Sequence, residues 1–286
     1  MLMLDYTALE ALAAVVETGS FEGAAVRLHV TPSAVSQRVK ALEARIGAVL
    51  VIRAQPCRAT EEGADLVRHL REVALLEARL HPPEAPPVLP LAVNADSLAT
   101  WVLPALAQID ERLFDLVIDD QEHSANWLRS GAVVAAITAD PGPVAGCDSV
   151  PLGRLRYIAT ASPAFVARWF PDGVNRHALA KAPAIQFNLK DRLQDQWASM
   201  ICGGQIALRS HRIASSEGFV AAALLGIGWG MNPEALVRGH LASGALVALG
   251  PAPIDVPLHW QSQRRLKVQL APLGRAIKDA ARTVLL

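Results

Sequence analysis

Residues 20–45, SFEGAAVRLHVTPSAVSQRVKALEAR, predict two short helices joined by a tight turn. Ser20 is a suitable N-cap for the first helix, because its hydroxyl can accept a hydrogen bond from a free backbone N–H. The apolar positions that follow at helical spacing are Ala24, Ala25 and Leu28. Residues 29–30 interrupt this spacing, so the first helix is expected to end there.

The second helix is expected to begin with Thr31 as its cap and Pro32 at its first position, where a missing N–H removes no hydrogen bond. Its apolar stripe consists of Val35, Val39 and Leu42. Two helices that cross over a short turn form a helix-turn-helix, which places its second helix in the major groove of DNA. The stretch therefore predicts a DNA-reading unit.

The polar face of the second helix carries the side chains expected to contact DNA. Gln37 can bond bidentately to adenine, serine hydroxyls can bond to bases or phosphates, and basic side chains can contact phosphates. The residues predicted for these contacts are Ser33, Ser36, Gln37, Arg38, Lys40 and Arg45. Paired amphipathic helices also occur in all-α cores that touch no nucleic acid, so the pattern alone leaves that alternative open.

The distribution of charge supports DNA binding by one segment of the chain and not by the chain as a whole. The first 60 residues hold six basic and five acidic side chains, and five of the six basic ones lie between Arg38 and Arg58, opposed there only by Glu43. The whole chain has 27 basic and 27 acidic residues. Attraction to DNA must therefore come from local patches, which disfavours a nucleoid-type protein that coats DNA.

The segments that flank the two helices complete the unit. Residues 6–18 predict a supporting helix that Gly19 ends, and residues 49–52 predict a strand. The chain then returns as a wing, in which Arg53 is expected to contact phosphate or, alternatively, to be merely solvated. We expect a winged helix-turn-helix domain over residues 1–59.

A long helix is expected over residues 60–80. Its apolar stripe is Leu66, Leu70, Val73, Leu76 and Leu80. A helix of about twenty residues is roughly 30 Å long, which suits a linker that holds two reading heads apart in a dimer. The alternative is that the stripe packs on its own chain. HPPEAPP opens the stretch 81–88 and predicts a stiff, proline-rich hinge.

Residues 89–286 predict an α/β domain, because short apolar strands alternate with helices. The expected strands are residues 89–93, 114–118, 133–138, 157–161, 184–187, 212–214, 228–231 and 258–261. The expected helices are residues 96–108, 124–130, 163–170, 217–225 and 264–286. This alternation indicates a parallel sheet.

Several classes of protein are disfavoured by what the sequence lacks. Three scattered cysteines form no disulfide framework, which suggests a reducing cytoplasm, and no apolar run reaches membrane-spanning length. The eight histidines show no metal-ligand spacing, and no nucleophile elbow, P-loop or dinucleotide fingerprint is present. We expect no enzyme activity, no cofactor, no metal and no membrane contact.

Residues 9–53, LEALAAVVETGSFEGAAVRLHVTPSAVSQRVKALEARIGAVLVIR, resemble the N-terminal domain of LysR-type transcriptional regulators. The shared features include AVSQ, LE and the G-x-x-L that enters the wing. The resemblance implies a homodimer, pairing into a tetramer, that binds double-stranded promoter DNA and contacts RNA polymerase. It also implies a two-lobed effector domain similar to periplasmic binding proteins, with lobe I at about 89–160 and 264–286 and lobe II at about 161–263.

A second resemblance is narrower. RAQPCRATEEG at 53–63 and LAVNADSLATWVLPAL at 91–106 look like the ArgP/LysG (IciA) group of that family. Membership of this group implies that the effector is a basic amino acid, lysine or arginine. It also implies that the regulated gene encodes an amino-acid exporter.

Polar residues that follow predicted strands are the candidates for effector binding, since ligands of open α/β sheets bind beyond the carboxyl ends of strands. Candidates for the effector α-carboxylate are Asn94, Ser97, Ser215 and Ser216, and for its cationic groups Asp96, Asp119 or Asp120, and Glu122. Consecutive strand residues point to opposite faces, so at most one of Asp119 and Asp120 is expected to face the ligand. Ser, Asn and Asp are also ordinary helix caps, which is the alternative for each.

One other class of protein explains part of the chain. A small-molecule binding protein without DNA function would account for residues 89–286, but it would leave the first 60 residues without a purpose. We therefore predict a ligand-responsive transcription factor.

Overall fold

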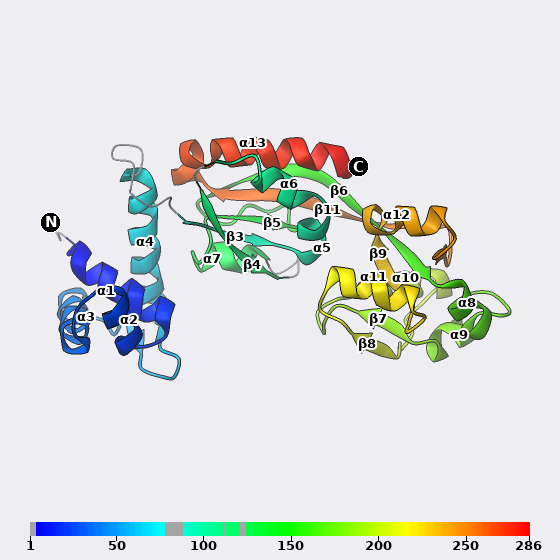
Figure 1. The fold of residues 1–286 in the computed structure, drawn as a ribbon, viewed down its shortest axis with the longest axis horizontal. Coiled ribbons are helices and arrows are strands. Elements are labelled where there is room, and N and C mark those ends of the chain that lie inside the picture. Colours follow the sequence, from blue (N-terminus) through cyan, green and yellow to red (C-terminus); the bar gives the residue numbers. More distant parts are fainter. Residues whose placement is uncertain (1–3, 78–87, 111, 120–123) are drawn as a thin grey trace.

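The computed structural model describes residues 4–77, 88–110, 112–119 and 124–286. Helix α4 (Glu61–Glu77) rises from an N-terminal winged module and faces an elongated effector domain, along which helix α13 (Lys267–Val284) extends (Figure 1). The predicted features that lie outside the described residues are the hinge at 81–87, Leu80, Asp120 and Glu122.

The winged module forms where the sequence predicts it. Its elements are α1 (Tyr6–Thr18), α2 (Phe21–Arg27), α3 (Pro32–Ile46), β1 (Val51–Ile52) and β2 (Arg58–Ala59). Ser20 Oγ accepts a hydrogen bond from the Gly23 N–H at 2.9 Å, and Thr31 Oγ1 accepts one from the Ala34 N–H at 3.2 Å. Both predicted caps are therefore confirmed, and Gly19 ends α1 in the left-handed conformation (φ 71°).

Helix α4 uses part of its apolar stripe within its own chain. Leu66 and Leu70, two residues of the predicted apolar stripe, pack against the core of the winged module beside the buried Val67. Leu75 lies instead in the core of the effector domain, whereas Leu76 is 42% exposed. The helix therefore contacts both parts of the chain.

The sheet of the effector domain is mixed rather than parallel. Strands β3 (Val88–Val93), β4 (Leu113–Ile118) and β5 (Ala135–Thr138) are parallel, as predicted. Strands β6 (Cys147–Ala161) and β11 (Ile254–Gln263) join them antiparallel, and with β10 (Val247–Ala248) the order is β10-β6-β11-β5-β3-β4. The parallel prediction was wrong for these two strands because the chain leaves the first lobe along β6 and returns along β11.

Strands β6 and β11 connect the two lobes (Figure 1). They pair from Ile254 with Tyr157 to Gln263 with Cys147, far beyond the short strands that the sequence predicts. Residues 259–262 of β11 pair with β5, so this part of β11 belongs to the first lobe's sheet, although the sequence assigned it to the second. Arg156 and Asp255 form a bidentate ion pair across the strands, with both N···O distances 2.8 Å, and the Arg156 hydrogen bonds lower the pKa of Asp255.

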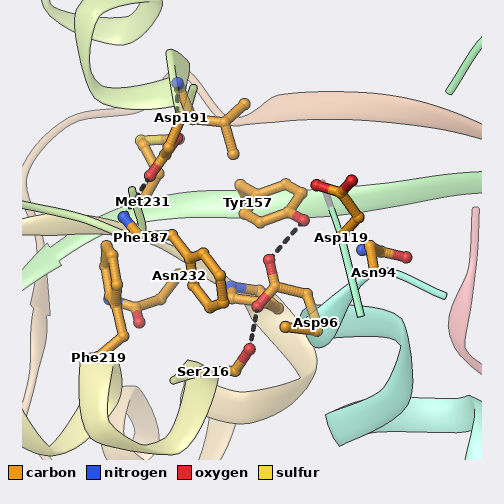
Figure 2. A pocket seen from close by; sticks show the side chains of 13 residues that line it. Asn94, Asp96, Asp119, Tyr157, Phe187, Asp191, Ser216, Phe219, Met231 and Asn232 are labelled. Atoms are coloured by element: carbon orange, nitrogen blue, oxygen red, sulfur yellow. Dashed lines mark hydrogen bonds between the residues drawn. The ribbon is translucent and has the colours of Figure 1, made fainter. Parts of the chain in front are cut away.

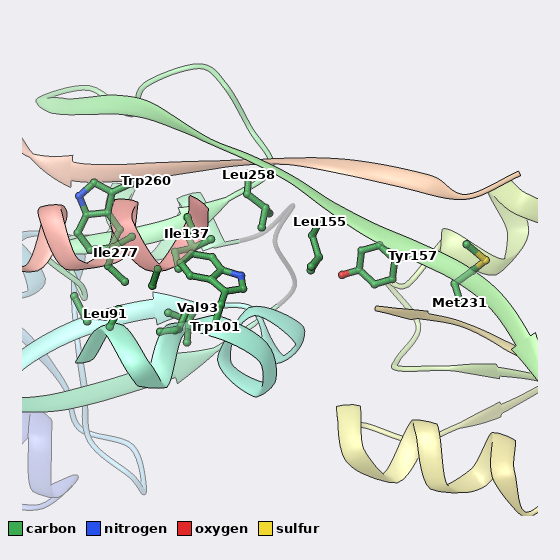
Figure 3. Close-up of a cluster of buried hydrophobic side chains, with 14 of the residues drawn as sticks. Leu91, Val93, Trp101, Ile137, Leu155, Tyr157, Met231, Leu258, Trp260 and Ile277 are labelled. Carbon is green, nitrogen blue, oxygen red and sulfur yellow. The ribbon is translucent and has the colours of Figure 1, made fainter. Parts of the chain in front are cut away.

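The first lobe is closed by helices on both faces of its sheet. They are α5 (Ala95–Ser97), a π-helical turn (Leu98–Val102), α6 (Leu103–Leu106), α7 (Ser124–Arg129), a 3-10 turn (Arg264–Leu266) and α13. Figure 3 shows Ile277 of α13 with Trp260, and Trp101 near Val93 and Ile137, within one continuous core. This packing fixes the carboxyl ends of β3 and β4.

The second lobe contains three helices that the sequence analysis missed. Its strands are β7 (Ala184–Gln186), β8 (Ser210–Arg212), β9 (Gly230–Pro233) and β10 (Val247–Ala248). Its helices are α8 (Pro163–Trp169), α9 (Arg176–Lys181), α10 (Leu193–Cys202), α11 (Ser216–Leu224) and α12 (Glu234–Ala242). Helices α9, α10 and α12 were missed. Trp197 and Trp229, with ring centroids 5.1 Å apart, anchor its core.

We predict that Gly63→Ala destabilises the winged module. A Cβ atom at Gly63 would lie 2.1 Å from the carbonyl oxygen of Leu50, so the gain of about 1 kcal/mol in helix propensity is outweighed by a clash of about 1–3 kcal/mol. All six tryptophans lie at or after Trp101. Urea unfolding should therefore show an earlier transition by far-UV circular dichroism and an unchanged transition by tryptophan fluorescence.

Gly239→Ala is the matched control. Gly239 lies within α12, and a Cβ atom there would meet no atom within 4 Å. This variant should stabilise the effector domain by about 0.5–1 kcal/mol. Equal behaviour of the two variants would contradict the proposed clash at Leu50.

Candidate functional site

The predicted DNA-contacting face of α3 lies opposite its buried stripe. Ser33, Gln37 and Lys40 are exposed, and Ser36 and Arg38 are half-buried. Because Val35, Val39 and Leu42 pack into the winged core, they fix the rotation of the helix. Ser33, Ser36, Gln37 and Lys40 are thus presented together on the outer surface, whereas Arg38 lies at the edge of the buried stripe.

Arg53 lies on the wing and has a partner that the sequence did not reveal. Its guanidinium lies 5.0 Å from the ring centroid of Phe21, the first residue of α2. A cation held over an aromatic face loses some of its freedom of movement. The wing arginine is therefore oriented relative to the helix-turn-helix while remaining exposed.

A pocket that is partly open to solvent lies between the lobes of the effector domain (Figure 2). Its lining residues are Asn94, Ala95, Asp96, Asp119, Tyr157, Phe187, Asp191, Leu193, Ser216, Phe219, Met231, Asn232 and Pro233. Three of the lining residues are aspartates, and none is a lysine or an arginine. The pocket wall is therefore acidic.

Asp96 links the two lobes across this pocket. Tyr157 Oη of β6 donates to Asp96 Oδ2 at 2.8 Å, and Ser216 Oγ at the start of α11 donates to Asp96 Oδ1 at 2.6 Å (Figure 2). Hydrogen bonds to a carboxylate are shorter and stronger than neutral ones. The Asp96 carboxylate, at the beginning of α5, thus binds the second lobe through the hydroxyl of Ser216.

Asp119 is the second carboxylate of the pocket and comes directly after β4. Trp127 Nε1 donates to its Oδ2 at 3.0 Å. Lys190 Nζ, from the second lobe, lies 3.3 Å from its Oδ1. An ion pair therefore crosses between the lobes at the pocket wall.

Asp191 is the third carboxylate, and the sequence analysis missed it. Its Oδ2 accepts from the Phe187 N–H at 2.8 Å and its Oδ1 from the Leu193 N–H at 3.1 Å. These bonds fold the segment between β7 and α10 into a turn. Asn188 followed by Asp191 ahead of an amphipathic helix is the signal that could have found it, since both residue types favour such turns.

Two buried amide side chains in the pocket have unsatisfied polar atoms. Asn94 is 2% exposed, and neither its Nδ2 nor its Oδ1 has a hydrogen-bond partner in the described structure. Asn232 is fully buried and donates to Thr160 Oγ1 at 2.9 Å, but its Oδ1 has no partner there. Unsatisfied buried polar groups are rare and are expected where a ligand or water binds.

Two of the serines that the sequence predicted for effector binding, Ser97 and Ser215, do not line the pocket. Ser97 is fully buried behind the pocket wall, and its Oγ has no hydrogen-bond partner in the described structure. Ser215 is exposed, and its hydroxyl accepts a hydrogen bond from the Gly218 N–H at 3.1 Å. It therefore acts as an ordinary helix cap of α11, which was the alternative prediction for this residue. The pocket residues that sequence reasoning missed are Ala95, Tyr157, Phe187, Asp191, Leu193, Phe219, Met231, Asn232 and Pro233.

The residues that the structure describes hold no metal-binding cluster and no membrane-spanning helix. No group of three or more His, Cys, Asp or Glu side chains there could hold a metal ion. No helix within those ranges is long and apolar enough to span a bilayer.

A winged helix-turn-helix joined by a long helix to a two-lobed domain with a pocket defines a DNA-binding regulator with a ligand-binding domain. Residues 6–64 match the family described as bacterial regulatory helix-turn-helix protein, lysR family, and residues 86–285 match the LysR substrate binding domain. The chain therefore belongs to the LysR family of transcriptional regulators, which are not enzymes.

Relatives match the chain over almost its whole length. The crystal structure of ArgP from Mycobacterium tuberculosis is 44% identical, covers 99% of both chains and has a TM-score of 0.87. Full-length LysG from Corynebacterium glutamicum with bound effector Arg is 38% identical, covers 99% of both chains and has a TM-score of 0.75. The lysine export transcriptional regulatory protein LysG of Corynebacterium efficiens is 40% identical over 282 residues, 96% of this chain and 97% of that protein.

We predict that Ser216→Ala lowers the free energy of unfolding of the effector domain. Loss of a hydroxyl that bonds to a carboxylate removes about 1.5–3 kcal/mol of stability. Urea unfolding followed by tryptophan fluorescence measures this loss. Ser243→Ala is the control. The Ser243 hydroxyl is exposed, and within the described residues it donates only to the carbonyl oxygen of His240. This variant should change the free energy of unfolding by less than about 0.5 kcal/mol. Equal effects would mean that the bond to Asp96 adds no stability.

Proposed function

We propose that this regulator senses a basic amino acid, arginine or lysine, in the pocket between its lobes and controls transcription of an amino-acid exporter gene. The acidic pocket wall is the observation that carries the proposal. Asp96, Asp119 and Asp191 approach the same space from both lobes. A cationic ligand is favoured there, because burying carboxylates together is unfavourable unless positive charge accompanies them.

The α-carboxylate of the ligand requires hydrogen-bond donors, and the strongest candidate is Asn94. Its buried amide is unsatisfied, and it precedes the helical run that begins with α5, whose first N–H groups favour an anion. Ser97, in the same turn, holds a second unsatisfied polar group. The sequence candidates Ser215 and Glu122 are not part of this proposal, because Ser215 caps α11 and Glu122 lies outside the described residues.

The relatives support the same ligand class. Full-length LysG from Corynebacterium glutamicum is described with bound effector Arg, and LysG from Corynebacterium efficiens is named for lysine export. The acidic lining of the present pocket agrees with a cationic effector. The name of the Corynebacterium efficiens protein motivates the proposal that an exporter gene is the target.

The DNA side of the proposal rests on α3 and the wing. Gln37 and its polar neighbours read the promoter, and Arg53 contacts the backbone of the duplex. We further propose a homodimer, pairing into a tetramer, because two reading heads are needed for an interrupted palindrome. Contact with RNA polymerase and a cytoplasmic location follow from the proposed role in transcription.

The effector signal would pass along α4. Its Val67 is buried in the winged core and its Leu75 in the effector core. Its Glu72 carboxylate lies 3.3 Å from Arg265 Nη1, just before α13. A change in lobe closure on ligand binding would therefore move a helix that is packed on the reading head.

We predict that Asn94→Ala weakens arginine binding about tenfold while leaving DNA binding intact. The expected loss corresponds to about 1.4 kcal/mol, the worth of one hydrogen bond to a charged group. Isothermal titration of the full chain with L-arginine, L-lysine and L-glutamate measures the affinity and the class of ligand. Asn126→Ala is the control, because Asn126 is exposed on α7 and contacts Arg129. Wild-type protein that binds neither basic amino acid would refute the proposed ligand.

We predict that Gln37→Ala reduces the preference for the operator over random DNA, because the loss of one bidentate base contact removes about 1–3 kcal/mol of discrimination. Gel-shift titration at fixed salt on the DNA upstream of the nearest divergent gene tests this. Gln108→Ala, an exposed change in the effector domain, should leave the footprint unchanged. An unchanged footprint with Gln37→Ala would show that the base-reading face lies elsewhere.

A further inference from the structure

Lys190 brings a primary ammonium group to the wall of the acidic pocket. Its Nζ lies 3.3 Å from Asp119 Oδ1, and the two residues belong to different lobes. The end of a lysine side chain is chemically the same cation as that of free lysine. The protein therefore carries its own analogue of the cationic group that the proposed function assigns to the ligand.

The backbone holds Lys190 in this position. Asn188 Oδ1 accepts from the Lys190 N–H at 2.7 Å and from the Asp191 N–H at 3.2 Å. The Asp191 carboxylate accepts two more backbone N–H groups, of Phe187 and Leu193. The turn that carries Lys190 is thus fixed at both ends, although its side chain is 48% exposed.

Asp119 is fixed on the other side of the pair. Its N–H donates to the carbonyl oxygen of Val93 at 3.3 Å, and the indole N–H of Trp127 donates to Oδ2. With Oδ2 held in this way, Oδ1 is directed to the second lobe. The side chain of Asp119 is 20% exposed, so a cation beside it is only partly screened by water.

We infer that Lys190 acts as a tethered competitor of the effector: a basic amino acid binds by replacing the Lys190 ammonium at Asp119. This inference rests on the proposed function. Exchange of one cation for another keeps a positive charge beside Asp119, whereas a ligand side chain without a charge would bring none to replace the ammonium group. Lys190 therefore lowers the affinity for every ligand that must displace it, and only a ligand with a cationic side chain regains an ion pair with Asp119.

Isothermal titration of the full chain with L-arginine tests the inference. Lys190→Met keeps the length and apolar character of the side chain but removes its charge, and it should tighten arginine binding about three- to tenfold. Lys190→Arg keeps the competing cation and should bind like wild type. Lys181→Met, at an exposed lysine on α9 of the same lobe, should also leave the affinity unchanged. Citrulline, which lacks the side-chain cation, should bind more weakly than arginine to wild type and to Lys190→Met alike, because it brings no cation to Asp119.

A second variant connects the effect to the ion pair. In an Asp119→Asn background, Lys190→Met should no longer tighten arginine binding, because the carboxylate for which the two cations compete is absent. If Lys190→Met binds arginine with the same affinity as wild type or more weakly, the inference is overturned, while the proposed ligand stands. Weaker binding would instead make Lys190 a ligand contact. Absence of binding in wild type and variant alike would refute the proposed function itself.

Discussion

The antiparallel pairing of β6 with β11 is the constraint on which the ligand-binding half of this protein depends. The two strands belong to the sheet of the first lobe at one end and reach the second lobe at the other, where β9 and β10 pair with β6. The bidentate bond between Arg156 and Asp255 fixes their register between the lobes. Every contact across the pocket is made possible by this connection, because it limits how far the lobes can separate.

Polar contacts between the lobes are concentrated at carboxylates. Asp96 receives hydroxyl groups from β6 and α11, and Asp119 receives an ammonium group from the turn before α10. These bonds use the groups that a cationic ligand would need. In the proposed function, ligand binding and lobe contact therefore draw on the same acceptors, so that the chemistry of the ligand and the geometry of the lobes are linked.

Local patterns in the sequence were sufficient for the winged module. Caps at Ser20 and Thr31, a proline at the first position of α3 and apolar residues at helical spacing act over a few residues, so the structure reproduces them closely. The long helix was also predictable from its period. Its packing was not, because Leu70 and Leu75 contact different cores and nothing in their spacing distinguishes those partners.

The sequence by itself determined the class of this protein, its DNA-reading helix and part of the pocket: Asn94, Asp96, Asp119 and Ser216 were expected because ligands bind beyond strand ends. Only the tertiary structure decided that β6 and β11 make the sheet mixed, and that Tyr157, Asp191 and Asn232 complete the pocket. The pairing of Lys190 with Asp119, 71 positions apart, also depends on it. The physical reason is range: caps and periodicity are local, whereas these contacts join residues far apart in the chain and form only when the two lobes are brought together.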